Sequence, residues 1–597
     1  MVRYSGRTAY VKVYTRSVLP EEYPDGLANS VHMAYSRDGI HYCPWNRNYG
    51  MLFAEAEICG NDTLRPRGIK NPCIFMAAPG RYGIAAVRAL EDGSPEYRDG
   101  AEVLLWMTSD FLRFERRPSF HVNAFGPAEK IFFRCCEKRN CYEICWQDSA
   151  GIWYRKETEA LPENETLSGE RWTGPEKETG DCAAVGSEIV TRACLRWNPV
   201  RHIRTMVPQS IRIRRWEDLS ELRAEAVYSD GSVSEKSVRW ELDQVDFKKK
   251  GYCRVRGELQ EEAYHFPLAS GYGDPVIFRW KGSWYFIGTN DNVDDIALYA
   301  RKADTVRELF AEGTRQQIIL DKDEERGLVQ TFWAPEFHVI GGDLYLLFAV
   351  SGKVWGPQCH MMKLKRDGEI LHPEDWEAPV RVRKKDGSWL AEDGITLDMT
   401  YLKAGGRSYM VWSYRRQIGT PLDTGSMLYI GEIDEATPWQ LKSDPVLLSR
   451  PLYGWENVNG TINNEGPHGF VKDGTVYLGY SGGSANAYTY AVGMLTAKED
   501  ADLLDPESWE KADTPVLSYY SVKGEYGPGH HSFFVDDQGE LRIAYHAEDA
   551  LHHTIRCDGI RRVHFDVEGR PRFDLSAEES LDPDLSQVEI QVEVIGE

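Results

Sequence analysis

One short strand pattern occurs five times in the C-terminal half of this 597-residue chain. Each copy carries a polar residue near its start, here called its leader, and continues into apolar and aromatic residues. Successive leaders are 62 to 67 residues apart. These leaders are Asp274, Glu336, Asp398, Glu465 and His530. A regular period of this length in a glycine- and aromatic-rich chain predicts radial repetition of one all-β unit, as in a β-propeller. We therefore expect the five side chains to meet near the axis of a ring.

The repeats set the predicted domain boundaries. Each copy is followed by a turn and a second strand rich in aromatic or branched residues, for example at residues 280–286 and 341–345. Turn residues between alternating apolar residues are typical of β-hairpins. The fold class is therefore predicted as all-β, with a five-bladed propeller over residues 266–575 and a C-terminal tail over residues 576–597.

Two other β-rich regions precede the repeats. Residues 200–265 alternate polar and apolar residues around the turn at 229–231, which predicts a small β-sandwich. Together with the segment 251–257, this region resembles a bacterial Ig-like domain. Residues 1–185 contain blade-like strands in which Asn71 stands where Asp274 stands in the first repeat. This predicts a propeller-like, non-catalytic N-terminal domain that forms either a wall of the binding site or a dimer contact.

The composition limits the possible partners. The formal net charge of −23 disfavours nucleic acid and anionic membranes, because both require clustered cations. A neutral ligand is favoured, and the oligomeric state stays open. The beginning of the sequence lacks the apolar core of a secretory signal. Ten of the twelve cysteines fall at or before Cys253, as expected for free thiols rather than a disulfide scaffold. These features predict a cytoplasmic location.

Several acids at one axis are costly, because neighbouring carboxylates repel each other. Hydrolysis of a glycosidic bond requires such a group: one carboxylic acid protonates the leaving oxygen, and one carboxylate activates water. A third acid can keep the first one protonated. Polar residues at strand starts can also simply bind channel water or a structural ion. The recurrence of acids at one repeat position, beside Trp333 and His530, favours catalysis.

The five polar residues lie in ordered motifs: Gly-Asp-Pro at Asp274, Trp-Ala-Pro-Glu at 333–336, Leu-Asp-Met at Asp398, Asn-Glu-Gly-Pro-His at 464–468 and Gly-Pro-Gly-His-His-Ser at 527–532. In this order, the motifs resemble those of glycoside hydrolase family 43. The resemblance covers roughly the C-terminal half and follows the order of the repeats. It implies a five-bladed propeller enzyme that acts on α-L-arabinofuranosides, β-D-xylosides or arabinan.

Carried over by position, the resemblance implies three catalytic residues. Asp274 would be the general base that activates water, and Glu465 would be the general acid. Asp398 would raise the pKa of that acid and orient it. Members of the family invert the anomeric configuration, so the carboxyl groups of Asp274 and Glu465 should lie about 6.5–9.5 Å apart.

Other positions carry weaker implications. Glu336 is read as structural or as a contact to sugar hydroxyls, and Trp333 as a surface for a pentose or an ordinary aromatic between blades. His530 matches a family residue that helps to hold a metal ion, commonly calcium, through water at the propeller axis, although it could simply be a hydrogen-bonding histidine. Arg556 falls near a substrate-binding arginine of the family, but Glu548 stands where relatives often carry arginine. No cofactor is required for the expected chemistry.

The sequence thus predicts an inverting exo-glycosidase that removes terminal pentose, foremost α-L-arabinofuranose, from plant-derived oligosaccharides such as those of hemicellulose. A β-D-xylosidase or a bifunctional enzyme is the nearest alternative, and an endo-arabinanase is another. A non-catalytic carbohydrate-binding propeller and a five-bladed enzyme with a retaining aspartate nucleophile also remain open.

Overall fold

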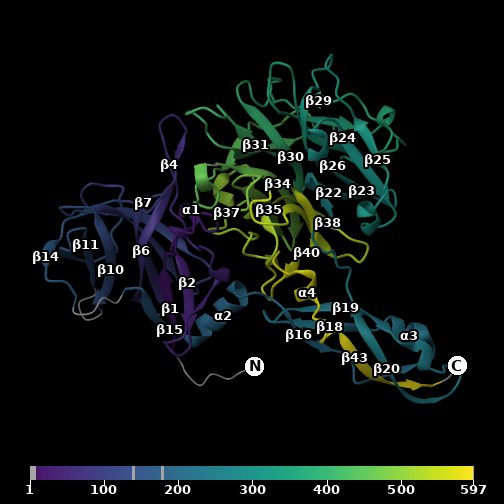
Figure 1. Ribbon diagram of the computed structural model, residues 1–597, viewed down its shortest axis with the longest axis horizontal. Helices are drawn as coiled ribbons and strands as arrows, with labels where there is room; N and C mark the ends of the chain where they lie inside the picture. Colours follow the sequence, from purple (N-terminus) through teal and green to yellow (C-terminus); the bar gives the residue numbers. More distant parts are fainter. Residues whose placement is uncertain (1–7, 137–140, 176–179, 461, 596–597) are drawn as a thin grey trace. The chain divides into compact units, whose positions relative to one another are not determined.

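The computed structural model describes residues 8–136, 141–175, 180–460 and 462–595. The described chain is predominantly β-structure, which confirms the predicted all-β class (Figure 1). It separates into two units. The first comprises residues up to Ala193 together with Phe266–Phe534 and Ala544–Gly559. The second comprises Cys194–His265 and Val535–Ile543 together with the residues from Ile560 onward.

Helices are few and short. The α-helices are α1 (Asp25–Ala28), α2 (Ser187–Trp197), α3 (Trp216–Ser220) and α4 (Ala577–Ser580). The 3-10 turns are η1 (Asn46–Asn48), η2 (Leu242–Gln244), η3 (Asp291–Val293), η4 (Arg307–Phe310), η5 (Pro373–Asp375), η6 (Val458–Gly460) and η7 (Pro506–Ser508). Across the described ranges, no helix has the length and apolar character needed to cross a membrane.

The repeats of the C-terminal half form five four-stranded sheets. In chain order the first four are β22 (Tyr272–Trp280), β23 (Ser283–Asn290), β24 (Leu298–Ala303) and β25 (Gln316–Leu320); β26 (Gln330–Ile340), β27 (Asp343–Ser351), β28 (Gln358–Lys363) and β29 (Val380–Arg381); β30 (Ile395–Ala404), β31 (Arg407–Arg415), β32 (Met427–Ile433) and β33 (Val446–Ser449); β34 (Asn464–Lys472), β35 (Thr475–Gly482), β36 (Ala491–Lys498) and β37 (Glu510–Lys511). Each predicted leader lies on the first long strand of its sheet.

The fifth sheet joins the two ends of this region. It contains β38 (Tyr526–Val535), β39 (Leu541–Glu548) and β40 (Cys557–Arg562), and its outer strand is β21 (Ala269–Ser270), which precedes the first sheet in sequence. The first strands of neighbouring sheets also contact one another, β22 with β26, β26 with β30, and β30 with β34. The sheets therefore follow one another around a common set of inner strands.

Successive sheets bury apolar cores between them. Leu346 and Phe348 of β27 pack in one core with residues of the first sheet, whereas Leu347, which lies between them, packs in another core with Met410 and Trp412 of the third sheet. Neighbouring residues of a strand point to opposite faces, so a sheet covered on both sides shows a continuous apolar run. The run Leu344–Val350 has this character, and it is fully buried.

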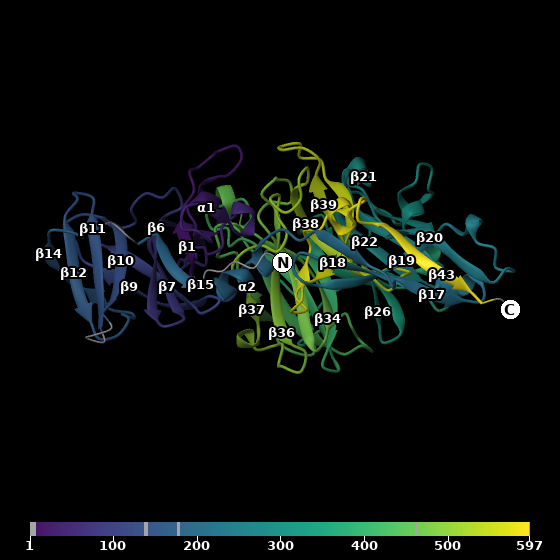
Figure 2. The same ribbon diagram turned by 90° about the horizontal axis from the view of Figure 1, so that it is seen from below.

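The N-terminal region contains three further sheets and one hairpin (Figures 1 and 2). Their strands are β15 (Cys182–Gly186), β1 (Thr8–Tyr14), β2 (His32–Ser36) and β3 (Cys43–Pro44); β13 (Thr166–Leu167), β9 (Glu115–Val122), β8 (Ala101–Thr108), β7 (Arg81–Leu90) and β6 (Arg67–Ala78); β10 (Ala128–Cys136), β11 (Cys141–Asp148), β12 (Trp153–Thr158) and β14 (Glu170–Trp172); and the hairpin β4 (Glu57–Ile58) and β5 (Leu64–Arg65). Strands β6 and β10 bring Phe75 and Phe133 together in a stacked pair, with ring centroids 4.4 Å apart.

The second unit extends beyond residues 200–265, for which the sequence predicts a small β-sandwich. Its main element is one six-stranded sheet in the order β16 (His202–Met206), β18 (Arg223–Tyr228), β19 (Val233–Trp240), β20 (Gly251–Gln260), β43 (Gln587–Val594) and β17 (Ser210–Ile213). Strand β43 comes from the segment predicted as a C-terminal tail, and it lies beside β20 in both views (Figures 1 and 2). This unit also contains a hairpin of β41 (His564–Phe565) and β42 (Pro571–Arg572).

Candidate active site

A β-bulge interrupts the first strand of the first four C-terminal sheets, in β22, β26, β30 and β34. One residue at this place, here called the bulge residue, has a positive φ, and His530 of β38 shares this conformation in the fifth sheet. The φ is 57° at Asp274, 45° at Ala334, 54° at Asp398, 55° at Gly466 and 39° at His530. Left-handed backbone costs a residue other than glycine about 1–2 kcal/mol. Such strain clusters at functional sites, where surrounding contacts hold it in place.

The bulges correct the predicted alignment of the repeat. Asp274, Asp398 and His530 occupy equivalent positions, but Glu465 comes one residue before its bulge, and Glu336 comes two residues after its own. Proline follows the bulge residue in three of the five sheets. Proline has no N–H to donate to a neighbouring strand, and it is tolerated at a bulge because the ladder of hydrogen bonds is interrupted there. In the N-terminal region, Asn71 also has a positive φ of 44° and precedes a proline.

Hydrogen bonds to the bulge N–H groups link the sheets. Thr289 of the first sheet accepts from the N–H of Ala334 in the second at 2.9 Å. Ser481 of the fourth sheet accepts from the N–H of His530 in the fifth at 2.8 Å. His546 of the fifth sheet accepts from the N–H of Asp274 in the first at 3.2 Å. The inner strands are therefore fixed by their neighbours, including a link from the last sheet to the first.

Asp274 is buried and surrounded by donors. Its Oδ1 lies 3.0 Å from Nη1 of Arg556 and 3.1 Å from Nδ1 of His530, and its Oδ2 accepts from the Thr289 hydroxyl. Burial alone would raise the pKa of this carboxyl, but the charges of His530 and Arg556 outweigh burial and hold the pKa well below its ordinary value. Asp274 is therefore ionised even in mild acid.

Glu465 and Asp398 lie in surroundings that raise their pKa values, in contrast to Asp274. Burial and, as the next largest cause, the negative charge of Asp398 raise the pKa of Glu465 to about 7. The Tyr490 hydroxyl donates to Oε1 of Glu465 at 2.9 Å. Asp398 accepts from the Ser413 hydroxyl and from the Gly466 N–H, each at 3.1 Å, while burial raises its pKa as well. The two acids titrate as a pair, and Glu465 carries a proton near neutral pH.

His530 is the cation among these acids. Burial opposes its charge, but Asp274, Asp398 and Glu465 together raise the pKa of its imidazole above the ordinary value. The ring is 7% exposed. His530 therefore balances part of the negative charge in the group.

Trp333 and Arg556 lie at the rim of this group. The Trp333 indole donates to Oδ2 of Asp295 at 2.8 Å and is half-buried. Arg556 pairs with Asp291 as well as with Asp274. Asp291 and Asp295 lie in the loop between β23 and β24. The loop thus orients both residues, and the Arg556 guanidinium is engaged by two carboxylates.

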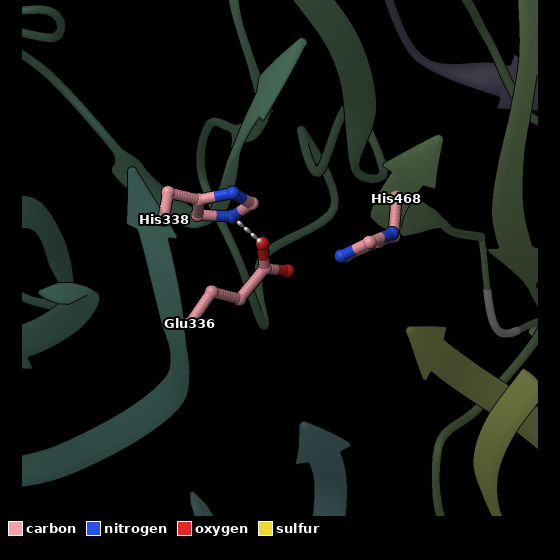
Figure 3. A group of neighbouring side chains, drawn as sticks. All are labelled: Glu336, His338 and His468. Carbon is pink, nitrogen blue, oxygen red and sulfur yellow. Dashed lines mark hydrogen bonds and ion pairs between the residues drawn. The ribbon is translucent and has the colours of Figure 1, made fainter. Parts of the chain in front are cut away.

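Glu336 belongs to a different cluster. Its Oε2 lies 2.6 Å from Nε2 of His338 on the same strand, and His468 approaches the carboxylate from β34 (Figure 3). The possible ligand atoms of these three residues lie within 4.8 Å of one another. Burial would raise the pKa of Glu336, but His468 and His338 lower it, so this carboxylate is ionised.

This cluster does not fit direct binding of calcium. Calcium takes six to eight oxygen ligands, whereas the cluster offers one carboxylate and two imidazoles. Nδ1 of His468 accepts from the Phe533 N–H at 3.3 Å, and burial lowers the pKa of His468 to about 4. The neutral ring therefore carries its proton on Nε2 and has no free lone pair there. His530 lies outside this cluster, with Nδ1 3.1 Å from Oδ1 of Asp274, and its role in holding calcium through water stays a prediction.

Several residues of the site were not predicted from the sequence. Thr289, Ser413 and Ser481 lie on second strands, opposite the residue that precedes each bulge. A hairpin alignment of the repeats would have shown hydroxyl residues at this position in three sheets. His546 and Tyr490, whose rings stack with centroids 5.6 Å apart, have no comparable sequence pattern.

Comparison with known proteins agrees with this arrangement. The profile of "Glycosyl hydrolases family 43" matches residues 265–571. An extracellular exo-α-(1→5)-L-arabinofuranosidase of Streptomyces avermitilis is 30% identical over 335 residues, which cover 53% of this chain and 64% of that protein. The enzyme of the same name from Streptomyces chartreusis is 33% identical over 292 residues, which cover 48% of this chain and 82% of that protein.

Solved structures give a further match. The crystal structure of α-L-arabinofuranosidase from Lactobacillus brevis has 30% sequence identity and a TM-score of 0.45, covering 52% of this chain and 96% of that one. The predicted cytoplasmic location is contradicted, because both Streptomyces relatives are named as extracellular proteins and point to secretion. The family profile covers more than half of the sequence, and this chain therefore belongs to glycosyl hydrolase family 43.

Proposed function

We propose that this protein is an inverting exo-α-L-arabinofuranosidase whose five C-terminal sheets are the blades of a β-propeller. The observation that carries the proposal is the contrast between two buried carboxyl groups in one site. Glu465 is held protonated near neutral pH, whereas Asp274 is held ionised. Carboxyl groups whose pKa values are pushed apart identify an acid and a base. The names of the curated relatives support arabinofuranose as the sugar.

In the proposed reaction, Glu465 donates its proton to the glycosidic oxygen as the bond from that oxygen to the anomeric carbon breaks. Water attacks the anomeric carbon from the opposite face, and Asp274 accepts the proton that the water loses. Tyr490 holds Oε1 of Glu465, which leaves Oε2 to carry the transferred proton. Solvent then returns the proton from Asp274 to Glu465. Asp398 acts through Glu465, because its charge keeps the acid protonated.

The remaining residues have supporting roles. Arg556 keeps Asp274 ionised, and its contacts with Asp274 and Asp291 support a positioning role more than a direct sugar contact. Trp333 is a candidate surface for the sugar, and Glu336 is structural. The Ig-like identity of residues 200–265 and the propeller-like identity of residues 1–185 stay predictions. The mechanism uses no metal ion.

The substrate test compares the purified protein on α-1,5-linked arabinotriose, 4-nitrophenyl α-L-arabinofuranoside and 4-nitrophenyl β-D-xyloside. We expect stepwise release of free arabinose, with the first product in the inverted anomeric form by NMR. Preference for the xyloside would replace the proposal with a β-D-xylosidase. Binding of the trisaccharide without hydrolysis would favour a carbohydrate-binding protein, and retention of configuration would exclude the proposed use of Asp274.

A further inference from the structure

An ion pair with a buried carboxylate takes no part in the proposed reaction but lies next to the strand that carries the proposed acid. Glu456 is 0% exposed, and its Oε1 lies 2.7 Å from Nζ of Lys511. The Tyr480 hydroxyl donates to Oε1 at 2.9 Å, and the Tyr453 N–H donates to Oε2 at 2.8 Å. Both oxygens of this buried carboxylate therefore have partners.

Asn464 connects this pair to Glu465, the next residue in the chain. Its Nδ2 donates to Oε1 of Glu456 at 2.8 Å. Its Oδ1 accepts from the Ser449 hydroxyl at 2.7 Å and from Nζ of Lys511 at 3.4 Å. Asn464 is 0% exposed. Its side chain is therefore fixed at both ends.

The backbone at this point needs such support. Among the described strands, β34 pairs with β35 alone, and an isolated bridge between Ser426 and Asn463 lies just before it on the other side. The regular pairing breaks between Glu465 and His468, where Gly466 has a φ of 55°. The N–H of Asn464 instead donates to the carbonyl of Ser426 at 2.9 Å. Near the acid, side chains and a neighbouring sheet therefore do much of the positioning that ladder hydrogen bonds do elsewhere.

We propose that Glu456 and Lys511 are positioning residues that aim the Glu465 carboxyl at the leaving oxygen through Asn464. The inference rests on the proposed function, since it assigns the pair to the acid step. Lys511 orients the Glu456 carboxylate, that carboxylate holds the Asn464 amide, and the amide fixes the backbone from which Glu465 projects. Loss of either charge displaces the acid without touching Asp274.

The test uses the dependence of the rate on the leaving group. A 4-nitrophenolate anion leaves without protonation, whereas a sugar hydroxyl needs the acid. We expect Lys511→Met to lower kcat on α-1,5-arabinobiose by about 10–100-fold. On 4-nitrophenyl α-L-arabinofuranoside, kcat should change less than about threefold, and KM should stay similar on both substrates.

The matched control is Lys236→Met in the second unit. Lys236 is also paired with a glutamate, with Nζ 2.7 Å from Oε1 of Glu261, and its side chain is 3% exposed. Its replacement should lower thermal stability without changing the ratio of rates on the two substrates. If Lys511→Met does not fold, Asn464→Ser carries the test, because it keeps the charges of Glu456 and Lys511 and removes the amide that joins them to the backbone before Glu465.

The outcomes separate the two proposals. A wild-type protein that hydrolyses neither substrate overturns the proposed function, and this inference with it. An active wild type whose Lys511→Met variant loses both activities equally, or neither, overturns the positioning role and leaves the glycosidase intact. Selective loss on arabinobiose, with an unchanged ratio in Lys236→Met, supports the positioning role.

Discussion

Nη1 of Arg556 lies 3.0 Å from Oδ1 of Asp274, a residue 282 positions away in the sequence. The same guanidinium pairs with Asp291, so it is held between two carboxylates. Gly273 makes this arrangement possible. A β-carbon at position 273 would lie 2.1 Å from the central carbon of the guanidinium. Any side chain at position 273 would therefore displace the Arg556 guanidinium, although the φ of Gly273 is not in the left-handed region.

Gly273→Ala should therefore displace Arg556 and disturb Asp274. A misplacement of about 1 Å in an active site can cost about 10²-fold in rate, and we expect a loss of kcat/KM of this order. The control is Gly60→Ala, because an added β-carbon there meets nothing within 4 Å. Unchanged kinetics in Gly273→Ala would show that the position of Arg556 does not matter for the reaction.

The pH dependence of kcat/KM should follow the two carboxyl groups. The proposed acid must be protonated, so activity should fall as the pH rises through about 7, the pKa of Glu465. The proposed base must be ionised, and the pKa of Asp274 lies well below its ordinary value, so activity should persist far into acid. In Asp398→Asn the loss of a nearby negative charge should shift the alkaline limb to lower pH. An alkaline limb that does not move would remove Asp398 from its assigned role.

Glu465→Gln should make the protein more stable at alkaline pH. The folded state raises the pKa of Glu465 from 4.5 to about 7, so it binds this proton more tightly than the unfolded chain does. The wild type therefore loses stability as the pH rises from about 4.5 to 7, by up to about 3 kcal/mol. Glutamine removes this cost. We expect a higher apparent Tm for the variant at pH 8 and no gain at pH 4; equal shifts at both values would contradict the raised pKa.

The repeat was visible in the sequence because the inner strands share proline, aromatic residues and polar leaders. The predicted alignment of the repeats was wrong at Glu336 and Glu465, which do not stand at the bulge position. The place of a bulge depends on the backbone conformation, which the sequence pattern does not show. Asp274 and Asp398, which stand at equivalent bulges, were aligned correctly. Glu336 consequently lies with His338 and His468 rather than with the other acids.

The second unit could not be predicted from local pattern. Strand β43 pairs with Gly251–Glu258, more than 300 residues earlier in the chain, and adds a parallel neighbour to β17. A short alternating segment near the end of a sequence does not specify such a distant partner. For the same reason, the contacts of Arg556 with Asp274 and of Tyr490 with Glu465 depend on the arrangement of whole sheets.

The central claim is that Glu465 and Asp274 act as acid and base in arabinofuranoside hydrolysis. It is tested most directly by the rates of the wild type, Asp274→Asn and Glu465→Gln on 4-nitrophenyl α-L-arabinofuranoside and α-1,5-arabinobiose. We predict that Asp274→Asn loses about 10²–10⁴-fold on both substrates, whereas Glu465→Gln loses as much only on arabinobiose. Turnover that persists at wild-type rates in either variant on arabinobiose would contradict the account.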